Sequence, residues 1–142
     1  MLQFVDLRSP VTTMASTRIL LVDDEALVRQ VLARILADYP DVEVVGQAAS
    51  GDEALLRVET LRPHVVIMDI RMPQMDGITA AREIKNKYPE VQILALTEFG
   101  HGYYAEAMLR AGALAVYQKV NAFEELYPAI KKVTTHTHLR GQ

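Results

Sequence analysis

The stretch that decides the fold is His64-Val65-Val66-Ile67-Met68-Asp69-Ile70-Arg71-Met72-Pro73-Gln74-Met75-Asp76-Gly77. It begins with a continuously apolar run, which is typical of a strand covered on both faces of a sheet. A carboxylate, Asp69, ends that run. We expect Pro73 and Gly77 to shape the loop beyond it, the proline by fixing its φ angle and the glycine by permitting unusual ones.

Similar short runs lie before and after this stretch, and segments with helical spacing of apolar residues separate them. The predicted strands are Arg18–Val22, Val42–Gln47, His64–Asp69, Val91–Leu96 and Leu114–Gln118, and the first four predicted helices are Glu25–Tyr39, Asp52–Leu61, Ile78–Tyr88 and Tyr103–Ala111. Strand–helix alternation with short connections implies right-handed crossovers and a parallel sheet. We therefore predict an α/β protein, a flavodoxin-like (βα)5 three-layer sandwich with strand order 2-1-3-4-5.

Length and composition indicate one globular domain. The chain has 142 residues, half of them hydrophobic, and a net charge of −3, so no broad basic surface points to nucleic acid or to an anionic membrane. It contains no cysteine, which excludes disulfides, thiolate catalysis and Cys-based zinc sites. The apolar runs are too short to span a membrane, and residues 1–16 do not resemble a secretion signal. We predict a cytoplasmic protein with a loose extension at 1–17, one domain at 18–135 and a tail at 136–142.

Charged and hydroxyl side chains gather where four of the predicted strands end. Asp23 and Asp24 follow the first strand, Asp69 ends the third, and Thr97 and Lys119 follow the fourth and fifth. In the order 2-1-3-4-5 these four strands are neighbours, and ligands of such sheets bind beyond the carboxyl ends of the strands.

Each of these residues also has a simple structural explanation. Asp24 precedes a helix and could be its N-cap, and Asp23 could be a solvated turn residue. Three carboxylates held together repel one another, however, so folding alone does not favour the arrangement. It is explained by a hard divalent cation such as Mg²⁺, which prefers carboxylate oxygens.

Asp69-Ile70-Arg71-Met72-Pro73-Gln74-Met75-Asp76-Gly77 resembles the D-x-x-M-P-x-M-D-G stretch of two-component response-regulator receiver domains. With Asp23-Asp24, Thr97 and Lys119 in register, the resemblance covers residues 17–135. It implies that Asp69 accepts a phosphoryl group from a sensor histidine kinase or phosphotransfer protein. Mg²⁺ would bind Asp24, Asp69 and the Arg71 carbonyl, with Asp23 acting largely through a water. Lys119 would pair with the phosphoryl oxygens, and Thr97 would hydrogen-bond one of them.

The resemblance also implies a switch rather than an enzyme, since such a domain catalyses only its own phosphoryl transfer and autodephosphorylation. Tyr117 matches the family's aromatic switch position. The expected coupling therefore runs from the phosphoryl group to Thr97, and from Thr97 to Tyr117 and the surface beneath helix 4. The face of helix 4, strand 5 and helix 5 would then change, and it is the expected homodimer or partner surface. Gly100 and Gly102, just before Tyr103, predict a weakly stable helix 4.

Three positions depart from the family pattern. Glu98 follows Thr97 where many receivers have a small residue, and its charge beside a phosphate needs compensation, for which Arg71 is the nearest candidate. Val120 follows Lys119 where many relatives have proline, so we do not assume a cis bond there. Pro128 lies inside the predicted fifth helix. Asn121 with Glu124 looks like a cap and its partner, but Pro128 would clash with the Glu124 carbonyl, so we expect this helix to start late or bend.

Rival functions fit less well. A flavodoxin-type electron carrier would not place Asp23-Asp24 in its phosphate-binding loop. A haloacid dehalogenase-type phosphatase would have a second aspartate where Arg71 stands. A pseudo-receiver, serving only for docking, would normally have lost an acidic position or the lysine. His136 and His138 suggest a metal site only weakly.

The runs Leu96-Thr97 and Arg110-Ala111-Gly112-Ala113 resemble the corresponding runs of receivers that precede a helix-turn-helix. Whether the chain is a single-domain regulator or an excised receiver stays open.

Overall fold

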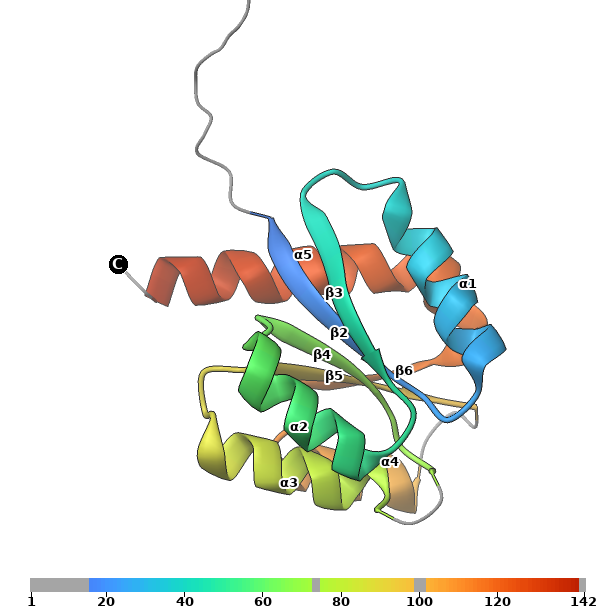
Figure 1. Ribbon diagram of the computed structural model, residues 1–142, viewed down its shortest axis with the longest axis vertical. Coiled ribbons are helices and arrows are strands. Elements are labelled where there is room, and N and C mark those ends of the chain that lie inside the picture. Colours follow the sequence, from blue (N-terminus) through green and yellow to red (C-terminus); the bar gives the residue numbers. More distant parts are fainter. Residues whose placement is uncertain (1–15, 73–74, 99–101, 141–142) are drawn as a thin grey trace, which may run out of the picture.

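The computed structural model describes residues 16–72, 75–98 and 102–140 (Figure 1). Pro73 and the extension at 1–15 lie outside these ranges, and so do the side chains of His136 and His138. The strands are β2 (Thr17–Val22), β3 (Val42–Ala48), β4 (Val65–Asp69), β5 (Gln92–Thr97) and β6 (Ala115–Gln118). The helices are α1 (Ala26–Ala37), α2 (Gly51–Leu61), α3 (Gly77–Lys87), α4 (Tyr103–Arg110) and α5 (Ala122–Arg140). None of the described helices is long and apolar enough to cross a membrane.

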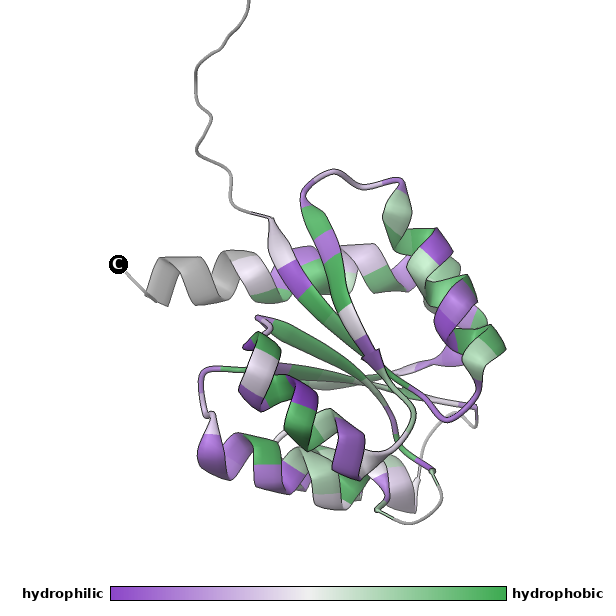
Figure 2. Cartoon of the chain, in the orientation of Figure 1, coloured by the Kyte–Doolittle hydropathy of each residue, from purple (hydrophilic) through white to green (hydrophobic). Residues whose placement is uncertain are grey.

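The five strands form one parallel sheet in the order β3-β2-β4-β5-β6. In chain order this is 2-1-3-4-5, so the predicted topology is confirmed. The β2–β3 pairing contains one register shift, between Ile19 and Leu20. Strand β4, which ends at Asp69, is central and buried along its whole length, as its apolar run predicts (Figure 2).

Alternate residues of the strands feed two separate apolar clusters, one on each face of the sheet. On one face the strands pack against α2, α3 and α4 through Val58, Ile84 and Met108. On the other face they pack against α1 and α5 through Leu36 and Ile130. The result is the three-layer sandwich that Figure 1 shows, with α2, α3 and α4 together below the sheet.

Local side-chain caps fix where two helices begin. The Ser50 hydroxyl accepts a hydrogen bond from the Glu53 amide at the start of α2, and the Glu53 carboxylate accepts one from the Ala49 amide. At the start of α3, the Asp76 carboxylate accepts from the Thr79 amide. Both arrangements satisfy amides that the first helical turn leaves unpaired.

The last helix differs from our expectation. A 3-10 turn, Lys119–Asn121, leads directly into α5 at Ala122, so the helix does not start late; the expected Asn121 cap and the bend at Pro128 stay predictions. It continues through Pro128 and extends to Arg140, into the segment expected to be a tail. Glu124 and Pro128 are both exposed, so water can reach the carbonyl that loses its partner to the proline. The described peptide bonds are trans, including the one before Val120.

Candidate functional site

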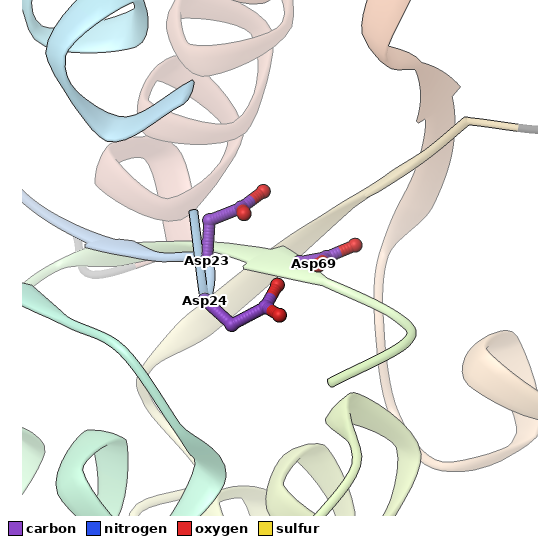
Figure 3. Close-up of side chains that lie close together, drawn as sticks. All are labelled: Asp23, Asp24 and Asp69. Atoms are coloured by element: carbon purple, nitrogen blue, oxygen red, sulfur yellow. The ribbon is translucent and has the colours of Figure 1, made fainter. Parts of the chain in front are cut away.

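Three carboxylates meet at the carboxyl ends of β2 and β4. One oxygen from each of Asp23, Asp24 and Asp69 lies within 4.8 Å of the others. Figure 3 shows the three side chains gathered where the strands end. Asp23 and Asp69 are buried and Asp24 is exposed. The site opens into a cavity of about 440 Å³ whose walls also include Glu25, Arg71, Met72, Thr97, Glu98 and Lys119.

Asp23 is held in place on several sides. Its carboxylate accepts a hydrogen bond from the Glu25 amide at 2.9 Å, and its own amide donates to the Ala48 carbonyl at 3.0 Å. The Arg29 guanidinium donates to the Asp23 carbonyl at 2.6 Å. The cap residue of α1 is Glu25, so Asp24 is not the N-cap that it could have been. The Asp24 carboxylate therefore has no capping role in α1.

Lys119 places a positive charge next to the buried carboxylates. Its ammonium lies 2.7 Å from an Asp23 oxygen, 3.4 Å from an Asp69 oxygen and 4.0 Å from a Glu98 oxygen. Burial lowers the pKa of Lys119, but the hydrogen bond to Asp23 and the charge of Asp69 outweigh that effect and hold the pKa above its usual range. The lysine is therefore a fixed cation beside the Asp69 carboxylate.

One ammonium does not compensate the whole acidic cluster. Burial, together with the negative charge of Asp23, raises the pKa of Asp69 to about 7, although Lys119 acts in the opposite direction. The Asp24 carboxylate adds to the rise. Without a further cation, Asp69 is therefore partly protonated near neutral pH, and a carboxyl group holding a proton is a poor nucleophile.

This pKa predicts how the stability of the metal-free protein depends on pH. An unfolded aspartate ionises near 3.8, so the folded state takes up a proton on Asp69 between about pH 7 and pH 3.8 that the unfolded state does not bind. We expect the free energy of unfolding to rise, relative to Asp69→Asn, as the pH falls through this range, by roughly 2 kcal/mol once relaxation is allowed for. Urea unfolding of both proteins in chelator measures the difference. The same pH dependence in both would show that Asp69 is ionised throughout.

Several sequence-predicted residues come together here as expected. Thr97 ends β5 and is buried, and its neighbour in the sheet register is Gln118, directly before Lys119. The cation that compensates the negative charge of Glu98 is not the expected one, Arg71. Its carboxylate pairs with Lys119, while the Arg71 guanidinium lies over the Tyr104 ring, with Cζ 5.4 Å from the ring centroid.

Tyr117 does not lie beneath α4 in this structure. Successive residues of a strand point to opposite faces, and Val116 packs against the cluster that contains Met108 of α4. Tyr117 is half-buried against the opposite cluster, which contains the α1 and α5 side chains. The expected placement of Tyr117 is therefore wrong for this conformation, and its role as a switch stays a prediction.

Gly77 is required for a reason other than the one we expected. Its φ is not among the positive values, which in the described residues belong to Gly102, Gly112 and Arg62. A Cβ at Gly77 would instead collide with the Asp69 carbonyl oxygen and lie 2.9 Å from the Ile70 Cα. The Gly77 amide donates to the Ile70 carbonyl at 2.8 Å. The glycine thus lets the start of α3 pack directly against the end of β4.

Sequence reasoning missed two residues that hold the site in place and one that lies beside it. Arg29 and Glu25 fix the loop that carries Asp23, and Tyr104 contacts the side chain of Arg71. Arg29 follows Asp23 by six residues and lies near the start of the predicted helix, so the sequence contained a signal for the first contact. No sequence signal points to Tyr104, because that contact depends on how α4 packs.

The donor set fits Mg²⁺. Magnesium takes oxygen ligands, and the site offers three convergent carboxylates in which one lysine leaves Asp69 with a raised pKa. A cation bound by these oxygens would lower that pKa and keep the acceptor ionised. The geometry therefore describes an α/β protein with an acidic cation site next to a buried carboxylate and a lysine.

The family comparison identifies this class. The family model for the response regulator receiver domain matches residues 19–131. The chain belongs to that family, and it is a receiver domain of a two-component response regulator.

Its relatives are response regulators. The chain is 39% identical over 116 residues to the response regulator GacA of Pseudomonas protegens, covering 82% of this chain and 54% of that protein. It is 33% identical over 117 residues to VraR of Staphylococcus aureus, and the match covers 82% of this chain and 56% of VraR. A LuxR-family two-component response regulator from Aurantimonas sp. SI85-9A1 has a similar structure, with a TM-score of 0.81 at 31% identity and coverage of 86% and 87%. The chain spans about half the length of the curated relatives it matches.

Proposed function

We propose that this receiver is a Mg²⁺-dependent switch in which Asp69 accepts a phosphoryl group from a sensor histidine kinase or phosphotransfer protein. The observation that carries the proposal is a buried carboxylate, Asp69, placed 3.4 Å from the Lys119 ammonium inside a cluster of convergent carboxylates. Labelling by acetyl phosphate in the presence of Mg²⁺, followed by intact mass, tests it. We also propose that the reaction takes place in the cytoplasm.

In the transfer step, an Asp69 oxygen attacks the phosphorus of the donor's phosphohistidine. A bond forms between that oxygen and phosphorus, and the bond from phosphorus to the histidine nitrogen breaks, with its electron pair leaving on the nitrogen. Lys119 pairs with the transferred oxygens, and the Thr97 hydroxyl hydrogen-bonds one of them. Phosphoryl transfer depends mainly on such positioning and charge compensation. Attack by water on the phosphorus later restores the Asp69 carboxylate.

Asp24, Asp69 and the Arg71 carbonyl are the proposed metal ligands, with Asp23 acting through a water. When bound, Mg²⁺ supplies charge neutralisation for the acceptor and for the incoming phosphoryl oxygens. Asp23 already pairs with Lys119 at 2.7 Å, which supports its more distant role toward the metal. Glu98 shares the same ammonium, so we propose that it modulates how readily an anion enters the site.

The exposed apolar side chains indicate two partner surfaces. Tyr103, Tyr104, Leu109 and Leu114 lie on α4 and just before β6, on the face proposed for homodimer or partner contact. Leu27, Val31, Val120 and Phe123 are exposed around an apolar groove of about 370 Å³ between α1 and the start of α5. Lys119 lines both this groove and the acceptor cavity. We assign the groove to the phosphodonor protein, because a protein that reaches Asp69 through the cavity must also cover the groove beside it.

Removing apolar surface from the groove should slow transfer from a protein donor and spare transfer from a small one. We expect Phe123→Ser to reduce the rate of phosphotransfer from an autophosphorylated sensor kinase that labels wild type by about tenfold, as loss of an apolar anchor does at interfaces. Labelling by acetyl phosphate should be unchanged. Leu56→Ser is the matched control, because Leu56 is 64% exposed on α2, away from the groove. Equal rates for Phe123→Ser and wild type with the kinase would remove the groove from the docking surface.

The switch would control either a partner protein or a DNA-binding output segment. The chain itself offers no strongly basic surface for nucleic acid, since its net charge is −3. We therefore propose that it acts on transcription indirectly, through protein contacts.

A further inference from the structure

One side-chain contact joins the metal-binding loop to the first turn of α4. Arg71 lies two residues beyond the acceptor Asp69, and its exposed side chain lines the acceptor cavity. Its guanidinium carbon is 5.4 Å from the centroid of the Tyr104 ring, which is within the range of a cation–π contact. Arg71 follows β4 and α4 follows β5, and these two strands are neighbours in the sheet.

Among the residues that the structure describes, the start of α4 has little buried surface and no side-chain cap. The helix spans eight residues, and Met108 is its buried side chain. Its N-cap is Gly102, with φ of +93° and no side-chain hydrogen bond to the first turn. A helix end with little buried surface and no cap has low local stability, so one contact there shifts its opening equilibrium measurably.

Tyr117 does not offer this connection in the present conformation. Its ring packs on the α1 and α5 face of the sheet, and the β6 residue that faces α4 is Val116. The contact between Arg71 and Tyr104 is a described link between the proposed acceptor site and α4 in this conformation.

We propose that Arg71 and Tyr104 form a latch through which occupancy of the acceptor site controls the first turn of α4. The proposal rests on Asp69 being the phosphoryl acceptor. A phosphoryl group on Asp69 places a dianion in the cavity that Arg71 lines, and a guanidinium binds phosphate oxygens more strongly than it binds an aromatic face. The guanidinium then leaves the ring, and the first turn of α4 loosens. Tyr104 is a positioning residue in this scheme and does not take part in phosphoryl transfer.

Amide hydrogen exchange across 103–110, with and without Mg²⁺ and beryllofluoride as the phosphoryl mimic, tests the latch. Wild type should lose about two- to fivefold protection in the first turn of α4 when the mimic binds, which is the magnitude of an exposed cation–π contact. Tyr104→Leu should show the loosened exchange already without the mimic, and little further change with it. Tyr104→Phe keeps the ring and should behave as wild type.

Two controls separate the latch from a general effect on the helix. Tyr103 is 74% exposed and meets the Tyr104 ring edge-on at 5.4 Å, so Tyr103→Leu removes an aromatic from the same turn without removing the ring beneath Arg71. It should keep the wild-type response. In an Arg71→Gln background, Tyr104→Leu should cause no additional loss of protection, since the two changes remove the same contact.

The outcomes distinguish this proposal from the proposed function. Tyr104→Leu should still be labelled by acetyl phosphate to the wild-type extent. If wild type is labelled but Tyr104→Leu responds to the mimic as strongly as wild type does, the latch is wrong and Asp69 remains the acceptor. If wild type is not labelled by any donor, the proposed function is wrong, and the latch that rests on it is wrong as well.

Discussion

Asp69→Asn is expected to abolish phosphorylation of this protein by acetyl phosphate, a loss that intact mass would show as the absence of the single phosphoryl adduct seen in wild type. The amide has nearly the same shape as the carboxylate, so the fold is retained, but its nitrogen and oxygen are not competent nucleophiles. The substitution also removes one charge from a cluster whose repulsion raises the pKa of Asp69, so the variant should be at least as stable as metal-free wild type. The loss of labelling is therefore chemical and not a result of unfolding.

Asp76→Asn is the matched control for this experiment. Asp76 belongs to the same loop region, but its carboxylate caps α3 by accepting from the Thr79 amide, and asparagine is an equally good cap. Labelling of Asp76→Asn should match that of wild type. An adduct that persists in Asp69→Asn would place the acceptor elsewhere. Absence of labelling in wild type with every donor would favour a docking module that no longer accepts phosphate.

The fold was predictable because each central strand is short, apolar and followed by a helix with clear amphipathic spacing. The run Val65–Met68 has no polar side chain, and both of its faces are covered in the structure. The order of the strands follows from the handedness of the crossovers and the known switch point of such sheets. The course of α5 was not predictable in this way, because whether a helix tolerates Pro128 depends on whether the freed carbonyl faces water.

The site was predictable to the level of which residues converge, but not of which atoms pair. Asp23, Asp69 and Lys119 are each placed by a strand end, and strand ends in a parallel sheet are fixed by topology. Side-chain partners are set by packing instead. Lys119 pairs with Glu98, and Arg71 lies over Tyr104. Tyr117 packs on the face opposite α4, because successive residues of a strand point to opposite faces and Val116 takes the face toward α4.

Asp24→Ala should separate the metal from the rest of the site. Asp24 is the exposed member of the three carboxylates and has no capping role, so alanine there should leave the fold unchanged. We expect Mg²⁺ affinity, measured by titration calorimetry, to fall by at least about tenfold, because loss of a direct ligand exceeds the usual effect of an outer-shell change. Labelling by acetyl phosphate should fall with it and lose its dependence on Mg²⁺.

The same variant gives a second, independent readout. The negative charge of Asp24 helps to raise the pKa of Asp69, so in metal-free Asp24→Ala the pKa of Asp69 should be lower than in metal-free wild type. Asp52→Ala is the matched control, since Asp52 is an exposed aspartate in the first turn of α2 that is not part of the cluster. Undiminished Mg²⁺ binding together with a lowered Asp69 pKa would mean that Asp24 acts on the acceptor only through its charge, and that the metal is held by other oxygens of the cluster.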